Sequence, residues 1–164
     1  MEYRVMPLQS DVQQEIDQYI ARLEWLYRNV EAWIAEREPN ARAHRTTVEL
    51  AEEATGPYKA ESLEIIRPGK PAVRLIPKGI FMVGAHGRVD VWSRLGREIV
   101  VWLDKGEPHL HVKSSEETGT LEQIVSPLYP VSQEGWAWAD ERQRAPRYLT
   151  EPVFVDELLD RLTT

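Results

Sequence analysis

The stretch GIFMVGAHGRVDVWSRLGREIVVWLDK, residues 79–105, holds the densest run of strand and turn signals in the chain. Three apolar or alternating runs within it, at residues 80–83, 89–93 and 99–103, predict three strands. The linkers between them contain glycine, the residue that turns with positive φ require. Because connections this short join antiparallel neighbours, the stretch predicts a β-meander at the heart of the sheet.

The second and third of these strands differ in how they should be covered. Val89 and Val91 fall on one face of their strand, and Asp90 and Trp92 fall on the other. The strand at residues 99–103 is apolar on both faces, so we expect it to lie centrally and to be covered on each side.

A long amphipathic helix is predicted at residues 10–38. The order Ser10-Asp11-Val12-Gln13 is typical of a capping box, and no glycine or proline follows until Pro39. A helix of about 28 residues is roughly 42 Å long, which exceeds the width of a small domain's core. Apolar side chains recur on one face at helical spacing, and these predicted contact residues are Ile16, Ile20, Leu23, Tyr27, Val30, Trp33 and Ile34.

Two packing partners are considered for this apolar stripe of the helix. It can lie across the protein's own sheet, or its outer part can pair with a second copy, because the 3.5-residue spacing persists along it. The bulk of Tyr27 and Trp33 favours packing against a sheet or in a broad bundle over a two-stranded coiled coil. Partners are therefore expected to be a second copy of this chain, giving a homo-oligomer, or another protein.

Further elements flank the meander. Thr46 or Thr47 can cap a short helix, with a strand at residues 46–50 as the alternative. Alternating runs at residues 62–67 and 72–76, joined by Pro-Gly-Lys-Pro, predict a hairpin. Short strands are expected at residues 109–112 and 136–138, with both tryptophan rings of the latter on one side. A terminal helix at 151–162 should bury Phe154, Val155, Leu158, Leu159 and Leu162.

Together these elements predict a single α+β domain over residues 1–164. The long helix at 10–38 and the short C-terminal helix at 151–162 should pack on a mostly antiparallel sheet within residues 60–140, arranged as a meander or a partly open barrel. At 164 residues the chain is long enough for one ordinary core.

Composition narrows the class of protein. The formal charge is −7, from 27 acidic and 20 basic residues, which makes nucleic-acid binding unlikely because phosphate contacts need concentrated Lys and Arg. No apolar run approaches the roughly 18 residues of a membrane-spanning helix, and residues 1–7 lack the apolar core of a signal peptide. Cysteine is absent. We expect a cytoplasmic protein that does not enter a membrane.

One arrangement resembles the restriction-endonuclease-like nucleases, in which a helix precedes a β-meander with an Asp on one strand and an acid-x-Lys on the next. Asp90 occupies the place of the first acid, and Asp104 with Lys105 occupies the place of the second. The resemblance implies a divalent cation on the two carboxylates and a lysine that orients water. Asp104 and Lys105 are adjacent, however, so they share a face only if a bulge shifts the strand.

Histidine offers a second candidate site. His109 and His111 share a strand face and are candidate metal ligands, with Asp104 or Glu107 nearby and His86 if its loop folds close. No third ligand follows at a recognisable spacing, so an edge strand with polar histidines is the competing interpretation.

Motifs of other chemistries are missing from the sequence. Gly79, Gly84 and Gly87 lack the context of a phosphate loop, and no serine lies in a nucleophile elbow. Arg142, Arg144 and Arg147, beside Trp136 and Trp138, could form a stacking surface for single strands or a solvated connector. No cofactor is expected. The sequence favours a non-enzymatic interaction or accessory protein that self-associates through its first helix, with the nuclease-like domain as the alternative.

Overall fold

The computed structural model describes residues 5–80, 86–104, 108–109, 129–130, 134–143 and 145–164. For residues 5–10 and for the pairs at 108–109 and 129–130, only the backbone is described. The predictions for residues 81–83, Lys105, Glu107, His111 and Arg144 lie outside the described residues, as does most of the strand expected at 109–112.

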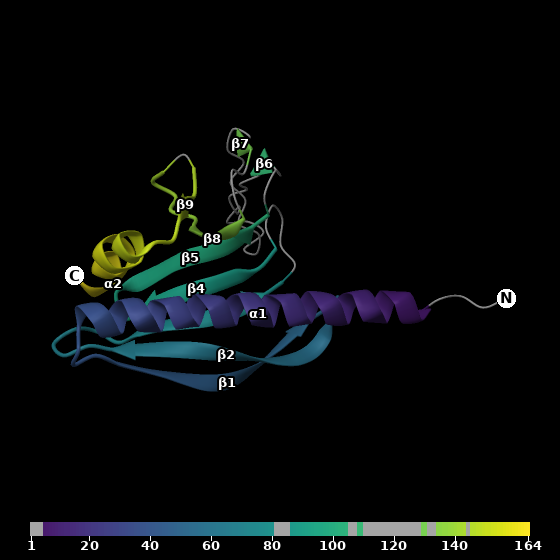
Figure 1. The fold of residues 1–164 in the computed structure, drawn as a ribbon, viewed down its shortest axis with the longest axis horizontal. Coiled ribbons are helices and arrows are strands. Elements are labelled where there is room, and N and C mark those ends of the chain that lie inside the picture. The colour runs from purple at the N-terminus through teal and green to yellow at the C-terminus, as the bar shows by residue number, and fades with distance from the viewer. Residues whose placement is uncertain (1–4, 81–85, 105–107, 110–128, 131–133, 144) are drawn as a thin grey trace.

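The fold is α+β, as the sequence predicts: two helical segments pack on an open, seven-stranded antiparallel sheet (Figure 1). The strands follow the order β1-β2-β3-β4-β5-β8-β9, and each neighbouring pair is antiparallel. Their bounds are β1 Arg42–Glu52, β2 Gly56–Ile66, β3 Val73–Gly79, β4 Arg88–Ser93, β5 Gly96–Leu103, β8 Gly135–Trp138 and β9 Arg147–Tyr148. A separate two-stranded pair joins β6 Pro108–His109 to β7 Tyr129–Pro130.

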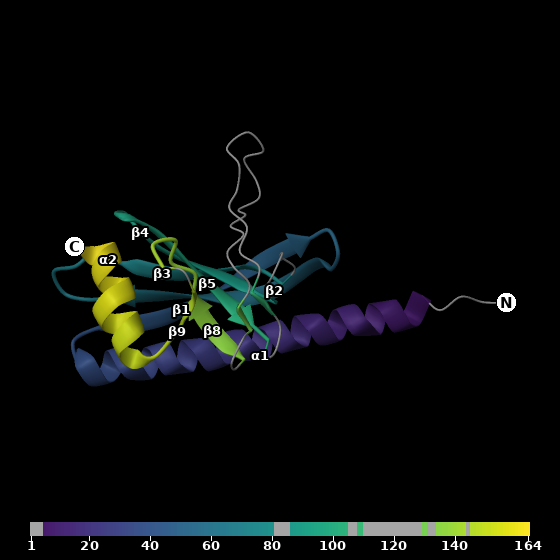
Figure 2. The same cartoon turned by 90° about the horizontal axis from the view of Figure 1, so that it is seen from above.

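The first helix, α1, runs from Val5 to Arg37. The predicted C-terminal boundary near Glu38 is confirmed, but the capping-box prediction is wrong because the helix continues through Ser10 to Val5. At 33 residues, or roughly 50 Å, α1 is longer than the sheet it crosses, and its N-terminal end extends beyond the strands (Figures 1 and 2). Local capping signals do not fix a helix start when the preceding residues also favour helix.

The C-terminal helix begins as η1 Pro152–Leu158, wound as a π-helix, and continues as α2 Leu159–Thr163. All five residues predicted to be buried here are buried. They join side chains of α1 in one hydrophobic core, where the Trp33 and Phe154 ring centroids lie 6.0 Å apart. Both helical segments therefore cover the same face of the sheet.

Within the sheet, register confirms most of the predicted pairing. Leu63 lies opposite Leu75 and Ile65 opposite Val73, so the predicted hairpin places its apolar side chains in the core. Residues 46–50 are strand rather than helix, since β1 pairs with β2 over eleven consecutive residues. The connector between α1 and β1 is short, because β1 already begins at Arg42.

The β1–β2 hairpin departs from simple alternation. Buried positions in β2 change from the even residues Tyr58, Ala60 and Ser62 to the odd residues Leu63 and Ile65. No register shift accompanies the change. Two-stranded ribbons twist strongly, so the outer half of the hairpin presents its other face to the core.

Candidate functional site

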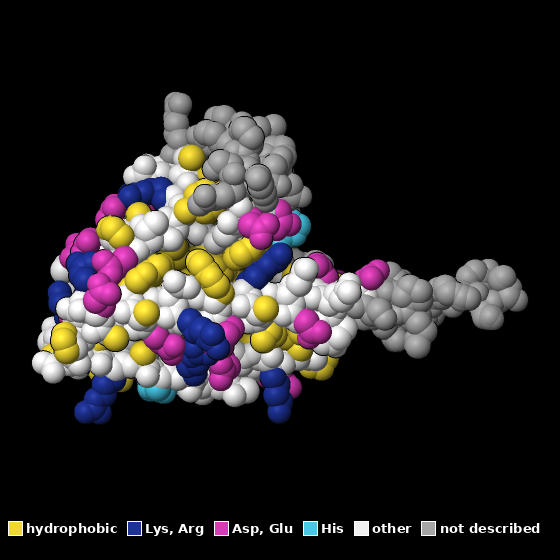
Figure 3. Space-filling model, in the orientation of Figure 1, with side chains coloured by type: hydrophobic (Ala, Val, Ile, Leu, Met, Phe, Trp, Pro, Cys, Tyr) yellow, Lys and Arg dark blue, Asp and Glu magenta, His cyan; other side chains and the backbone are white. Residues whose placement is uncertain are grey.

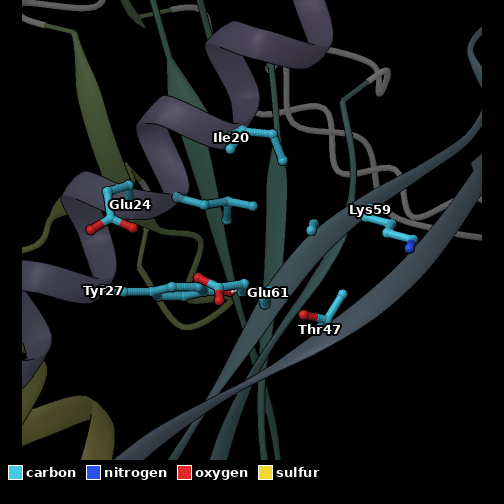
Figure 4. Close-up of a pocket in the computed structure, with 8 residues that line it drawn as sticks. Ile20, Glu24, Tyr27, Thr47, Lys59 and Glu61 are labelled. Atoms are coloured by element: carbon cyan, nitrogen blue, oxygen red, sulfur yellow. Dashed lines mark hydrogen bonds between the residues drawn. The ribbon is translucent and has the colours of Figure 1, made fainter.

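A groove of about 310 Å³ lies between α1 and the outer half of the β1–β2 hairpin. Its apolar floor comes from Ile20, Leu23 and the Tyr27 ring on α1 and from Ala60 on β2 (Figure 4). Charged and polar side chains form the rim, which consists of Glu24, Thr47, Lys59 and Glu61. The groove exists because the twisted hairpin bends away from the straight helix.

Arg45 neutralises the acidic side of this groove. Its guanidinium donates to Glu24 at 2.5 Å, to Glu31 at 2.9 and 3.0 Å, and to Glu61 at 3.3 Å. Hydrogen bonds from Arg45 and Arg28 lower the pKa of Glu24. The pKa of Arg45 is raised, mainly by its hydrogen bonds to Glu31. Glu24 is therefore held in the charged form and has no proton to donate near neutral pH.

Tyr27 cannot supply that proton either. Its hydroxyl donates to the Glu61 carbonyl at 2.5 Å, and burial raises the pKa of the phenol above its usual value. The groove thus combines an apolar floor with a rim whose two glutamates are bonded to Arg45, which suits contact with another surface better than acid–base catalysis.

A second buried polar cluster fastens the hairpin tip to the end of β3. Tyr19 donates to the Arg88 carbonyl at 2.6 Å and accepts from the Gly79 amide at 3.2 Å. Glu52, at the end of β1, accepts from the Ile80 amide at 3.1 Å and from Tyr58. Gly79 has φ +139°, and a Cβ there would lie 2.8 Å from the Glu52 carboxylate, so glycine is required for this closure.

The seven residues predicted to form an interface lie in the protein's own core instead. Five are buried, while Ile20 and Trp33 are partly buried against the same core. Of the two partners considered for the helical stripe, the described side chains select the protein's own sheet. The described part of the stripe is therefore used within the chain, and an interface formed by these seven residues stays a prediction.

The nuclease-like candidates Asp90 and Asp104 lie on opposite faces of the sheet. Asp90 pairs across β4 and β5 with Ile99, whereas Asp104 follows Trp102, whose side chain packs toward α1. Asp90 is buried, and its carboxylate accepts from Arg88 at 2.7 Å, with Arg97 at 3.7 Å. Two carboxylates on opposite faces cannot share a cation, so the geometry gives the resemblance no support.

Asp104 instead lies beside His86 and Arg22. His86 Nε2 is 3.1 Å from its carboxylate, Arg22 is 3.8 Å away, and Trp102 donates to it at 3.0 Å. Arg22 supplies a positive charge beside the Asp104 carboxylate. Among the described residues, no group of three or more His, Asp or Glu side chains is placed to hold a metal ion. His109 is described only by its backbone.

The tryptophan and arginine residues near the C-terminus form a structural cluster. Trp136 and Trp138 are buried on the α1 side, so both rings do lie on one face as predicted. Arg161 lies 4.7 Å from the Trp138 ring, and Asp140 receives bonds from Arg142 and Arg161. Burial raises the pKa of Asp140, but the two arginines outweigh it and the net shift is downward. A base cannot stack on rings enclosed in this way.

Sequence reasoning missed the outer edge of β1. This strand ends the sheet, and among the described residues no strand pairs with its outer side. It is eleven residues long, without proline and without a bulge in its pairing to β2. Natural edge strands are usually short, bulged or interrupted, because a long regular edge pairs readily with another strand. The available signal was the β-branched Thr46-Thr47-Val48 between charged ends.

The face that carries α1 shows basic and acidic side chains interspersed, with hydrophobic side chains between them (Figure 3). Among the residues that the structure describes, no helix combines the length and hydropathy of a membrane span. Comparisons of this chain with protein-family models, with curated protein sequences and with solved structures found no match.

Proposed function

We propose that this chain is a non-enzymatic interaction protein that self-associates, and that the contact is antiparallel pairing of its β1 edge with β1 of a second copy. The proposal keeps the self-association that the sequence favours and moves it from the helical stripe to the sheet edge. The observation that carries it is the uncovered, eleven-residue edge strand. Strand addition at such an edge is a common mode of protein association.

Geometry limits the registers available to such a pair. In an antiparallel ladder, alternate residues direct their N–H and C=O groups toward one edge. Glu61, opposite Thr47, directs its carbonyl to Tyr27, while the Thr46 carbonyl accepts from Ser62 on β2. This places Thr46 toward β2 and Thr47 toward the free edge. Odd residues must then face odd residues of the second copy, and each symmetric register is centred on one residue.

A register centred on Thr47 matches the charges of the strand. It sets Arg42 opposite Glu52 of the second copy and Arg45 opposite Glu49 of the second copy. Centring on Thr46 or Val48 sets these charges opposite neutral residues or His44. Basic residues lie in the first half of β1 and acidic residues in the second, so antiparallel pairing brings opposite signs together.

Two of these four charged side chains already have partners within the chain, and two have no ion-pair partner among the described residues. Arg45 is held by three carboxylates, and Glu52 is held by Ile80 and Tyr58. Arg42 and Glu49 make no ion pair with the described residues. Arg42 would therefore meet a carboxylate that is already held in position, which lowers the entropy cost of forming that pair. Glu49 would meet an arginine that three carboxylates already share, so its pair contributes less.

The ion pairs select the register, and the backbone ladder supplies the attraction. Exposed ion pairs contribute only about 0–1 kcal/mol each. Like charges directly opposite each other on adjacent strands are unfavourable by similar amounts, so wrong registers and foreign strands are disfavoured.

Light scattering after size-exclusion chromatography tests the proposal. Wild-type protein is expected to approach twice the 19.0 kDa of one chain as concentration rises. Glu49→Arg places like charges at two symmetric positions and should weaken the dimer about tenfold or more. Glu53→Arg is the matched control, because it makes the same charge change in the exposed β1–β2 turn outside the paired strand.

Arg42→Glu, which would face Glu52 of the second copy, should weaken the dimer similarly, whereas Arg74→Glu on β3 should not. A protein that stays monomeric at every concentration would contradict self-association. A dimer equally stable in Glu49→Arg and Glu53→Arg would contradict this register.

A further inference from the structure

The sheet face opposite the helices carries a row of aligned side chains near one end. Strand register places Glu64, Arg74, Trp92 and Arg97 side by side across β2, β3, β4 and β5. Arg74 and Arg97 therefore flank Trp92 on its two sides. The Arg97 guanidinium lies 5.7 Å from the Trp92 ring centroid.

Large apolar side chains are exposed at the same end of the sheet. Trp92 is 41% exposed, Ile66 at the end of β2 is 42% exposed, and Leu95 in the β4–β5 turn is 48% exposed. Among the described residues, Trp25 on the outer side of α1 is the remaining exposed large hydrophobic side chain. The contrast with the buried Trp102, Trp136 and Trp138 shows that Trp92 is not needed to fill the core.

Two of the arginines near this ring have no counter-ion among the described residues. Arg88 and Arg97 are neutralised by the buried Asp90. Arg74 on β3 and Arg94 in the β4–β5 turn are exposed and make no ion pair with any described residue. Apart from Arg42 on β1, the other arginines whose side chains are described are ion-paired, as Arg45 is with three carboxylates. The surface around Trp92 therefore carries local positive charge on a chain of net charge −7.

We propose that this surface binds single-stranded nucleic acid, with a base stacked on Trp92 and flanking phosphates bound by Arg74 and Arg94. An exposed aromatic ring on an antiparallel sheet, bordered by arginines, supplies the two interactions that single strands need. The site is separate from the β1 edge, and nucleic-acid binding at this site does not require self-association.

The ring distinguishes this ligand from an acidic peptide. Carboxylates would satisfy Arg74 and Arg94 but would leave the Trp92 face in water, whereas a nucleobase covers it. The negative charge of the rest of the molecule opposes long-range attraction of a polyanion, so binding is expected to be modest and confined to low and moderate salt.

Fluorescence anisotropy with labelled single-stranded oligonucleotides tests the stacking contact. Oligo(dT) and oligo(dA) are titrated with the full chain at low salt. Trp92→Ala should weaken binding about tenfold or more, which is the usual effect of removing one stacking platform. Trp25→Ala is the matched control, since it removes an equally exposed tryptophan from α1 and should leave affinity unchanged.

Salt dependence tests the phosphate contacts. Two neutralised phosphates on a single strand predict a slope of log affinity against log salt of about −1.4. Arg74→Ala should reduce the magnitude of that slope by about 0.7, because one counter-ion fewer is released. Arg28→Ala, which removes an arginine paired to Glu24 on α1, should leave the slope unchanged.

Three results would overturn the proposal: no binding of either oligonucleotide at low salt, equal affinities for wild type and Trp92→Ala, or equally tight binding of polyglutamate with the same response to Trp92→Ala. The solution mass of Trp92→Ala should match that of wild type. A failed dimer test and a failed oligonucleotide test are thereby separable.

Discussion

The two faces of β4 are built from different chemistry although both are buried in part. Val89 and Val91 face α1 and are packed in the apolar core. Asp90, between them in sequence, is equally buried on the other face, where Arg88 and Arg97 compensate its charge. Trp92, next on that face, remains exposed. One face thus excludes water with apolar packing, while the other buries one ion pair network and leaves an aromatic ring outside.

The difference between the two faces of β4 predicts the largest loss of stability for a charge placed on the face that packs against α1. Val91→Asp puts an unpaired carboxylate among apolar side chains, at a cost above about 4 kcal/mol, which is a large part of a typical domain's stability. We expect loss of cooperative urea unfolding followed by circular dichroism. Val91→Thr, nearly the same size, is the control and should still unfold cooperatively. A Val91→Asp midpoint near that of wild type would contradict the assignment of this face.

An intermediate loss of stability is expected for a substitution at Asp90, one residue before Val91. Asp90→Asn removes the charge that Arg88 and Arg97 share and should lower the free energy of unfolding by about 2 kcal/mol. The cost is below that of a fully buried pair because both arginines reach solvent. Glu64→Gln is the control, since Glu64 forms an exposed pair with His44 at 3.3 Å and should change stability little. Equal urea midpoints for the two variants would show that Asp90 is not a structural counter-ion.

The smallest effect is expected at Trp92. Trp92→Ser loses one exposed ring and its contact with Arg97, so the free energy of unfolding should fall by less than about 1 kcal/mol. The same urea measurement on Trp138→Ser should show a far larger loss, because that ring is enclosed in the core. If Trp92→Ser were as destabilising as Trp138→Ser, the ring would be structural rather than a binding surface.

Local patterns were enough to predict much of the fold. Alternation in β3 and β4 predicted their faces, and the spacing of Leu23, Val30 and Ile34 predicted the buried side of α1. Such patterns succeed because side-chain direction in a strand or helix follows directly from its period. The same rule indicated that Asp104 and Lys105 do not share a face of the strand without a bulge.

Patterns failed where distant contacts decide. The sequence of residues 46–50 is compatible with a helix or a strand, and the eleven residue pairs between β1 and β2 favour the strand. The predicted capping box at Ser10 lies inside α1. The change of buried face along β2 comes from the twist of the ribbon and not from any residue in it. For β1 and β2 the competing local states differ by little, so tertiary pairing determines the outcome, whereas at Ser10 the preceding residues themselves continue the helix.

The candidate surfaces show the same division. The sequence by itself determined that α1 has one apolar side, that β4 alternates, and that β1 carries basic residues before acidic ones. Only the tertiary structure decided that the apolar side of α1 is covered by its own sheet, that β1 is the edge strand, and that Trp92 lies between two arginines. The physical reason is that composition and period fix which way a side chain points, whereas strand order fixes what it meets.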